Sequence, residues 1–391
     1  MEESIIERKC IFSKFNKYFI FPFLMPIMKV IATYLIRDIL SQHYEKNGQK
    51  ALFFSAVFEC LTLIGGGLSY FIYFFKNIKD RKKKNEEDNI KSSYPIELIY
   101  NDSQKLNIKI IIILLIIMSL ISSSALFVHY FVIGGKDKID NLFYEILFIF
   151  IFSKKILNIE IYIHQKISLI LSFIGFILLI IPVITEIKKN EIHFIFIDFV
   201  NSAAYSLYII LIKYLTDKMY ISQYTCLFCV SFLNFLFELI IIMIFSLINE
   251  NNIIYLRYSF IFPQLNGKQL YLKFIPSFIL LSICHIFTYL IINYISPIIY
   301  IITYIIYTFI IWILGSINLI PDNENFSDDY IKLILYILGY LLYIFACLII
   351  NEMIILNFWG LSENTKEFIV RREKQDKNLL NDINEDSNFG I

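Results

Sequence analysis

Long apolar runs recur along the whole chain, and they constrain the fold more than any other feature. A membrane-crossing helix needs about 20 mostly apolar residues. Ten segments approach or exceed this length: 17–40, 51–75, 107–132, 139–153, 166–186, 193–215, 222–248, 273–294, 297–319 and 331–356. The first is polar for a span and the fourth is short. Because backbone groups in lipid must be hydrogen-bonded within the segment, we predict an all-α integral membrane protein with ten transmembrane helices.

The composition excludes several other classes of protein. Hydrophobic residues make up 58% of the 391 residues and charged residues 18%, whereas soluble domains average about 45–50% apolar and about 25% charged. This excludes a soluble enzyme and a disordered chain, and six cysteines in a chain of this length do not make a disulfide framework. A net charge of +1 provides no basic field for nucleic acid, so we expect membrane lipids and no nucleic acid among the partners.

The distribution of Lys and Arg among the loops predicts the orientation. Cytoplasmic loops carry an excess of basic residues, and placing both termini in the cytoplasm gives that side roughly twice as many Lys and Arg residues as the other. An even number of spans agrees with this arrangement. We therefore expect a multi-pass protein of an endomembrane (Golgi, ER or vacuolar) or of the plasma membrane, with both termini cytoplasmic.

Polar side chains recur at helical spacing within several spans. Residues three or four apart share a helix face, and an ionised side chain in hydrocarbon costs roughly 2.5–3.5 kcal/mol. Such series favour a shared polar cavity, although Ser, Thr and Tyr also serve as hydrogen-bonding contacts between helices, and that alternative stays open. The candidate substrate-binding residues are Lys29, Glu59, Glu145, Asp198, Asn201, Tyr205, His285 and Tyr304.

Two stretches resemble a known family. Residues 143–179 contain a short apolar segment, a charged turn, and Gln165 ten residues before Gly175, and they are similar to the fourth and fifth spans of the drug/metabolite transporter superfamily. Residues 331–366 resemble the last span of its EamA-like and solute carrier family 35-like members. The matching positions there are Gly339, Asn351, Glu352, Asn357, Gly360, Leu361, Asn364 and Thr365.

The resemblance implies two inverted five-helix repeats. The first would comprise residues 1–186 with a basic cytoplasmic loop at 76–106, the second residues 187–360, and residues 361–391 would form a disordered cytoplasmic tail. Substrate would cross between helices one to four and six to nine, with the fifth and tenth outside. The chain departs from the family at Ser231, where relatives often carry glycine, and at Tyr304, where relatives can carry an acid.

Motifs for catalysis or metal binding are weak. Cys226 and Cys229 form a CxxC pair, but a structural zinc site needs four ligands and no second pair exists. His193 and Asp198 are spaced as in some acyltransferases, without the glycine- and arginine-bearing blocks that accompany that pair. We therefore expect no enzyme activity, no cofactor and no metal.

The combined features predict a secondary transporter or exchanger of a small polar metabolite that works by alternating access. A nucleotide sugar or a related organic solute is among the candidate substrates, although no nucleotide-sugar signature maps onto the chain. Two alternatives stay open: a non-transporting membrane receptor or scaffold, in which the buried charges are dispensable, and a membrane-embedded enzyme, which would need a clustered catalytic set. A homodimer also stays open.

Overall fold

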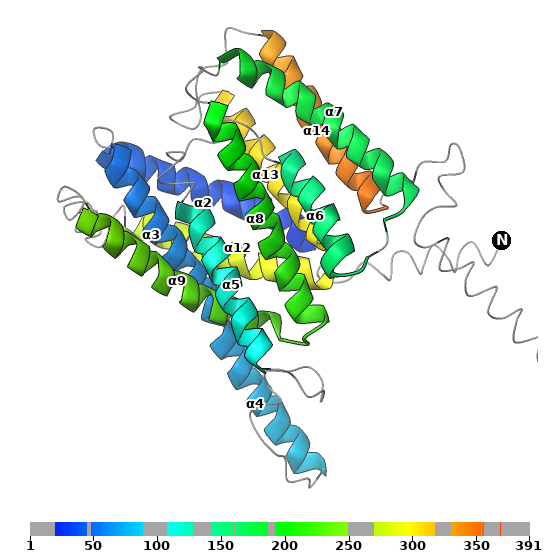
Figure 1. The fold of residues 1–391 in the computed structure, drawn as a ribbon. Coiled ribbons are helices and arrows are strands. Elements are labelled where there is room, and N and C mark those ends of the chain that lie inside the picture. Colours follow the sequence, from blue (N-terminus) through cyan, green and yellow to red (C-terminus); the bar gives the residue numbers. More distant parts are fainter. Residues whose placement is uncertain are drawn as a thin grey trace, which may run out of the picture.

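The computed structural model describes residues 20–44, 48–88, 108–127, 142–159, 161–186, 192–248, 270–316, 330–352, 354–355 and 368, and every regular element in these ranges is a helix. In chain order (Figure 1) they are α2 (Phe21–Tyr44), α3 (Gly48–Gly67), α4 (Ser69–Asp88), α5 (Ile108–Phe127), α6 (Leu142–Ile156), α7 (Ile163–Glu186), α8 (Ile192–Asp217), α9 (Gln223–Ile248), the π-helix η5 (Leu270–Phe274), α12 (Ile275–Tyr294), α13 (Pro297–Ser316) and α14 (Tyr330–Ile350).

Each of the ten predicted segments coincides with a helix, and the second contains α3 and the start of α4. Eight spans within the described ranges are long and apolar enough to cross a membrane. They correspond to the predicted segments other than the first and the fourth. The other two are α6, which has only 15 residues, and α2, which contains Lys29, Arg37 and Asp38. The chain is a multi-pass membrane protein.

The outward faces of the helices fit this assignment. On α5, Ile111, Leu115 and Met118 are buried, whereas Ile112 and Ile113 are more than half exposed. The buried positions repeat every three or four residues, which is the spacing of one helix face. Soluble monomers rarely expose contiguous apolar surface of this kind, and hydrocarbon chains are its natural surroundings.

Two helices end at other residues than the predicted segments do. The predicted loop 76–106 begins in the structure as helix, because α4 continues to Asp88. Its Lys, Arg and Glu residues favour helix almost as strongly as alanine does, so a charged composition does not end the helix. The last span ends at Ile350, earlier than predicted, and Glu352 adopts a positive φ of 56° after it. Residues 89–106, and the predicted tail apart from Phe368, lie outside the described residues.

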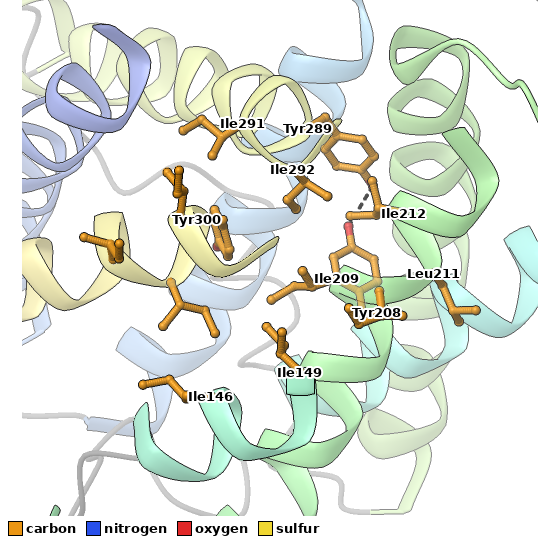
Figure 2. Close-up of a cluster of buried hydrophobic side chains, with 14 of the residues drawn as sticks. Ile146, Ile149, Tyr208, Ile209, Leu211, Ile212, Tyr289, Ile291, Ile292 and Tyr300 are labelled. Atoms are coloured by element: carbon orange, nitrogen blue, oxygen red, sulfur yellow. Dashed lines mark hydrogen bonds between the residues drawn. The ribbon is translucent and has the colours of Figure 1, made fainter. Parts of the chain in front are cut away.

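The buried centre lies where α6, α8, α12 and α13 meet. Figure 2 shows isoleucines from these helices, including Ile149 and Ile212, around two tyrosines that point toward one another. The hydroxyl oxygens of Tyr208 on α8 and Tyr289 on α12 are 2.8 Å apart. A hydrogen bond between them satisfies two buried polar groups that would otherwise cost free energy. It joins the two helices across the apolar centre.

Helices α7 and α14 pack closely on each other, beside the rest of the bundle (Figure 1). Glycines make the approach possible: a Cβ added to Gly175 would lie 3.1 Å from the backbone oxygen of Gly339. Small residues at helix contacts in membranes serve this purpose, because they let two backbones come together.

Replacing Gly339 with leucine should therefore separate the pair. A Cβ at this position would lie 2.6 Å from Cγ of Leu179, and overpacking of this kind costs about 1–3 kcal/mol. We expect a lower melting temperature for the purified protein in detergent. Leu338→Phe adds bulk at the neighbouring exposed position and is the control. Equal melting temperatures for the two variants would contradict the close packing.

Candidate functional site

Lys29 of α2 lies against two tyrosine rings of α13. Its Nζ atom is 4.8 Å from the ring centroid of Tyr304 and 4.5 Å from that of Tyr307. At these distances the ring quadrupoles attract the ammonium group, most strongly where water is excluded. Thr33, one turn further along α2, has its Oγ1 3.0 Å from the Tyr307 hydroxyl oxygen. Three contacts thus join α2 to α13, two from Lys29 and one from Thr33.

Glu59 of α3 is half-buried and lies within electrostatic range of the Lys29 ammonium group. One turn later, the fully buried Thr62 donates a hydrogen bond to the backbone oxygen of Glu59 at 2.7 Å, and its Oγ1 is 3.2 Å from Nε2 of His285 on α12. Since the threonine proton is used in the first bond, we infer that Nε2 is the donor in the second. Lys29, Glu59, His285 and Tyr304, all predicted site residues, are thereby brought together as the central cluster.

Three consecutive glycines bring α3 close to this cluster. A Cβ added to Gly66 would lie 3.0 Å from the backbone oxygen of Ser282 and 3.1 Å from Cβ of His285, both on α12. A Cβ at Gly67 would collide with the Ser231 hydroxyl on α9. The glycines therefore let α3 lie in close contact with α9 and α12 at once. The helix is interrupted by a turn at Leu68, directly after them.

Glu145 and Asp198 lie in a second group of polar residues, between α6 and α8, and are 8% and 1% exposed. The Ser206 hydroxyl of α8 donates to the backbone oxygen of Glu145 at 3.1 Å. The Tyr205 hydroxyl lies within electrostatic range of the Glu145 carboxylate, and the Tyr144 hydroxyl within range of that of Asp198. We call Glu145, Asp198 and Tyr205 the α6/α8 cluster.

Tyr300 of α13 connects the two clusters. Its hydroxyl oxygen is 2.5 Å from that of Tyr205, and it lies within electrostatic range of both Lys29 and Glu145. Figure 2 shows its ring in the buried centre of the bundle. A continuous series of polar side chains therefore runs through the interior, from the α6/α8 cluster to the central cluster.

The outcome for the predicted site residues is uneven. Asn201 is half-buried on α8, one turn after Asp198, and within the described part of the chain it makes no hydrogen bond to the other predicted site residues. Three residues were missing from the prediction, namely Glu238, Tyr300 and Tyr307. The tyrosines lie on a polar series of the ninth span. Glu238 continues a series in the seventh, Ser231, Asn234 and Glu238, whose spacings of three and four are those used to select the other spans.

One end of the bundle is closed by hydrogen bonds between helices. Gln223, which begins α9, receives a hydrogen bond at 3.2 Å from the amide nitrogen of Asn293 and donates one at 3.1 Å to the hydroxyl of Tyr294, both at the end of α12. Lys213, near the end of α8, donates to the backbone oxygen of Asn293 at 2.5 Å and pairs with Asp217 at 3.2 Å. We call Lys213, Gln223, Asn293 and Tyr294 the end network.

No protein-family profile matches this chain, and no curated protein gives a significant match to it. The resemblance to the drug/metabolite transporter superfamily therefore stays a prediction that rests on the residues quoted for it. The contacts inside the bundle, rather than relatedness, are the basis for the functional conclusion.

Proposed function

We propose that the protein is a secondary transporter or exchanger of a small polar metabolite, working by alternating access. The observation that carries the proposal is the meeting of ionisable side chains from distant helices inside a membrane bundle. Lys29 and Glu59 come from the first half of the chain, and His285 and Tyr304 from the second. Polar groups at this depth are costly and typically line the path of a substrate or ion.

The pairing of the helices supports two inverted repeats. If α2 to α7 and α8 to α14 are the repeats, with α3 and α4 as one span, then the packing of α6 on α8 corresponds to that of α13 on α2. In the same way α5 on α9 corresponds to α12 on α3, and α5 on α8 to α12 on α2. The pairs α3–α9 and α7–α14 each join equivalent helices. Substrate sites of such transporters lie at the interface between repeats, which is where the central cluster lies.

A departure from this symmetry supports alternating access. Helix α12 also packs on α8 and α9, whereas α5 has no comparable packing on α2 or α3 among the described residues. The extra contacts of α12 include the end network. We assign this arrangement to a conformation closed at the end network, which the predicted orientation places on the cytoplasmic side. Rocking one repeat against the other would exchange the closed end for the open one.

Weakening the end network should loosen the closed end. The variant Gln223→Ala with Asn293→Ala removes side-chain hydrogen bonds worth about 0.5–1.5 kcal/mol each. We expect backbone amides at the start of α9 and the end of α12 to exchange with deuterium up to about tenfold faster, because 1.4 kcal/mol is a factor of ten. Thr308→Val is the control, since its hydroxyl bonds the carbonyls of Tyr304 and Ile305 in its own helix. Unchanged exchange at the two helix ends would mean that the end network does not hold this end closed.

Flux into reconstituted vesicles tests the proposal directly. Purified protein would be offered labelled nucleotide sugars, amino acids, phosphorylated sugars and organic cations, with protein-free vesicles as the control. Saturable, counterflow-stimulated uptake of one class supports transport and names the substrate. If no class moves while a solute still binds, the receptor alternative takes its place.

A further inference from the structure

We infer that Glu238 and Glu59 form a binding site for a single proton in the interior of the bundle. Its role as the coupling ion rests on the proposed transport function, whereas the site itself rests on the side chains alone. The proton would sit on a carboxylate oxygen of Glu238, with Glu59 as the neighbouring carboxylate and Lys29 as the cation beyond it.

The register of α3 and α9 brings the two carboxylates together. Gly67 of α3 lies against Ser231 of α9. Glu59 precedes Gly67 by about two helical turns, and Glu238 follows Ser231 by about two turns, so each lies about 11 Å along its own helix from that contact. The helices run antiparallel, because earlier residues of α3 meet later residues of α9: Glu238 lies within electrostatic range of both Glu59 and Cys60.

Glu238 is buried in a way that an ionised carboxylate rarely is. Its side chain is 2% exposed, and neither carboxylate oxygen receives a hydrogen bond from any residue that the structure describes. Buried carboxylates are ordinarily hydrogen-bonded or paired with a cation, because burying the charge alone is costly. Binding a proton removes that charge without requiring another protein group.

No described residue donates a hydrogen bond to the Glu238 carboxylate, and the neighbouring helices bring few charged groups to it. Glu59 and Cys60 face it from α3, and the α5 residues Ser122 and Ser123, which contact Asn234 one turn earlier on α9, carry no charge. On α12 the nearest titratable groups are His285, which is joined to α3 through Thr62, and the buried Cys284. Neither side chain carries a negative charge in its neutral form. Helix α4 contacts α9 through Tyr70 and Tyr73, which stack on Phe228 and Tyr224 near the start of α9 and far from Glu238. On α8, Lys213 and Asp217 pair with each other at the end network.

Lys29 of α2 is a cation within electrostatic range of Glu59, whereas no described residue forms a hydrogen bond with the Glu238 carboxylate. One proton bound at Glu238 neutralises the carboxylate whose two oxygens are buried without a hydrogen bond from any described residue. A metal ion fits less well, because no group of three or more His, Cys, Asp or Glu side chains among the described residues is placed to hold one. A proton needs only one oxygen.

The proton balance of a transport cycle follows from this arrangement. Water on the open side supplies the proton, and an O–H bond forms at Glu238 while Glu59 stays ionised beside Lys29. When the opposite end opens, the O–H bond breaks and water on that side accepts the proton. No oxidant, reductant or other reactant is required.

Infrared spectroscopy of the purified protein tests the site without any substrate. Spectra at neutral pH, in H₂O and D₂O, should contain a carbonyl band of a protonated, buried carboxylic acid that Glu238→Gln removes and Glu352→Gln retains. Because glutamine resembles a protonated glutamate in shape and charge, Glu238→Gln should fold and melt at or above the wild-type temperature. An unchanged band would overturn the site, and so would a Glu238→Gln protein that melts markedly lower or fails to fold.

A separate arm tests coupling. Once the flux screen has identified a transported solute, a pH gradient should drive its accumulation in vesicles with the wild type, and Glu238→Gln should retain exchange while losing the accumulation. Accumulation that persists in the variant would overturn the coupling role. If the infrared band is present but no solute moves, the proposed function fails while the proton site stands; if the band is absent, the site fails whatever the flux.

Discussion

Replacing Lys29 with methionine should destabilise the folded protein by about 3–5 kcal/mol, the usual cost of removing one partner from a buried group of charges. The ammonium group lies against Tyr304 and Tyr307 and within range of Glu59. Methionine keeps most of the side-chain length and loses the charge, so Glu59 loses a cation within its electrostatic range. Unfolding of the variant in detergent, followed by helix signal or fluorescence, measures the effect.

A second substitution identifies the cause of that loss. Glu59→Gln in the Lys29→Met background should restore a large part of the stability, because it neutralises the carboxylate that Lys29→Met has left without that cation. Residues in one charge network show such interaction energies in double-mutant cycles. Lys154→Met, at an exposed position near the end of α6, is the control and should change the stability little. Additive effects of the two substitutions would mean that Lys29 and Glu59 are not coupled.

Neutralising Glu59 or Asp198 should reduce substrate flux at least tenfold while the protein still folds. A tenfold loss corresponds to about 1.4 kcal/mol, less than the interaction of one charge with a substrate in a water-poor interior. Glu59→Gln and Asp198→Asn preserve the shape of each side chain and would be compared with the wild type in the same vesicles. Melting temperatures measured on the same samples separate lost transport from lost folding.

An unchanged flux in both variants would have a different meaning. If the two carboxylates serve packing alone, neutralising them leaves flux unchanged and leaves stability equal or higher, because a buried ion is expensive. That combination would remove both residues from the substrate site. It would also favour the receptor or scaffold alternative, in which the buried charges are dispensable.

The membrane helices could be predicted from the sequence because apolar length is a local property. A run such as residues 297–319 needs no knowledge of its neighbours to be assigned as helix, and α13 spans Pro297–Ser316. The end of the helix after the second span could not be predicted from charge. Basic residues end an apolar run, but they are also good helix formers. Local composition therefore indicates where each apolar segment ends, but not where its helix ends.

The site could be predicted only in part, for a geometric reason. Helical spacing shows which polar residues share a face, but the rotation of each helix and its neighbours decides which faces meet. Lys29 and Tyr304 are far apart in sequence and lie in contact, whereas Asn201 lies one turn from Asp198 on α8 and makes no hydrogen bond to another predicted site residue among those the structure describes. Glu238 lies on a series of the same kind, yet its closeness to Glu59 depends on the antiparallel register of α3 and α9.

The break between α3 and α4 has a mechanical consequence. Helix α4 continues beyond the bundle (Figure 1), and its 20 residues make a rigid rod about 30 Å long. A rotation of about 5° at the base of such a rod displaces its tip by about 3 Å. Small rotations at the glycine segment would therefore produce larger displacements at the tip of α4, and a pair of spin labels on the tip and on a fixed helix would detect them as a change in distance.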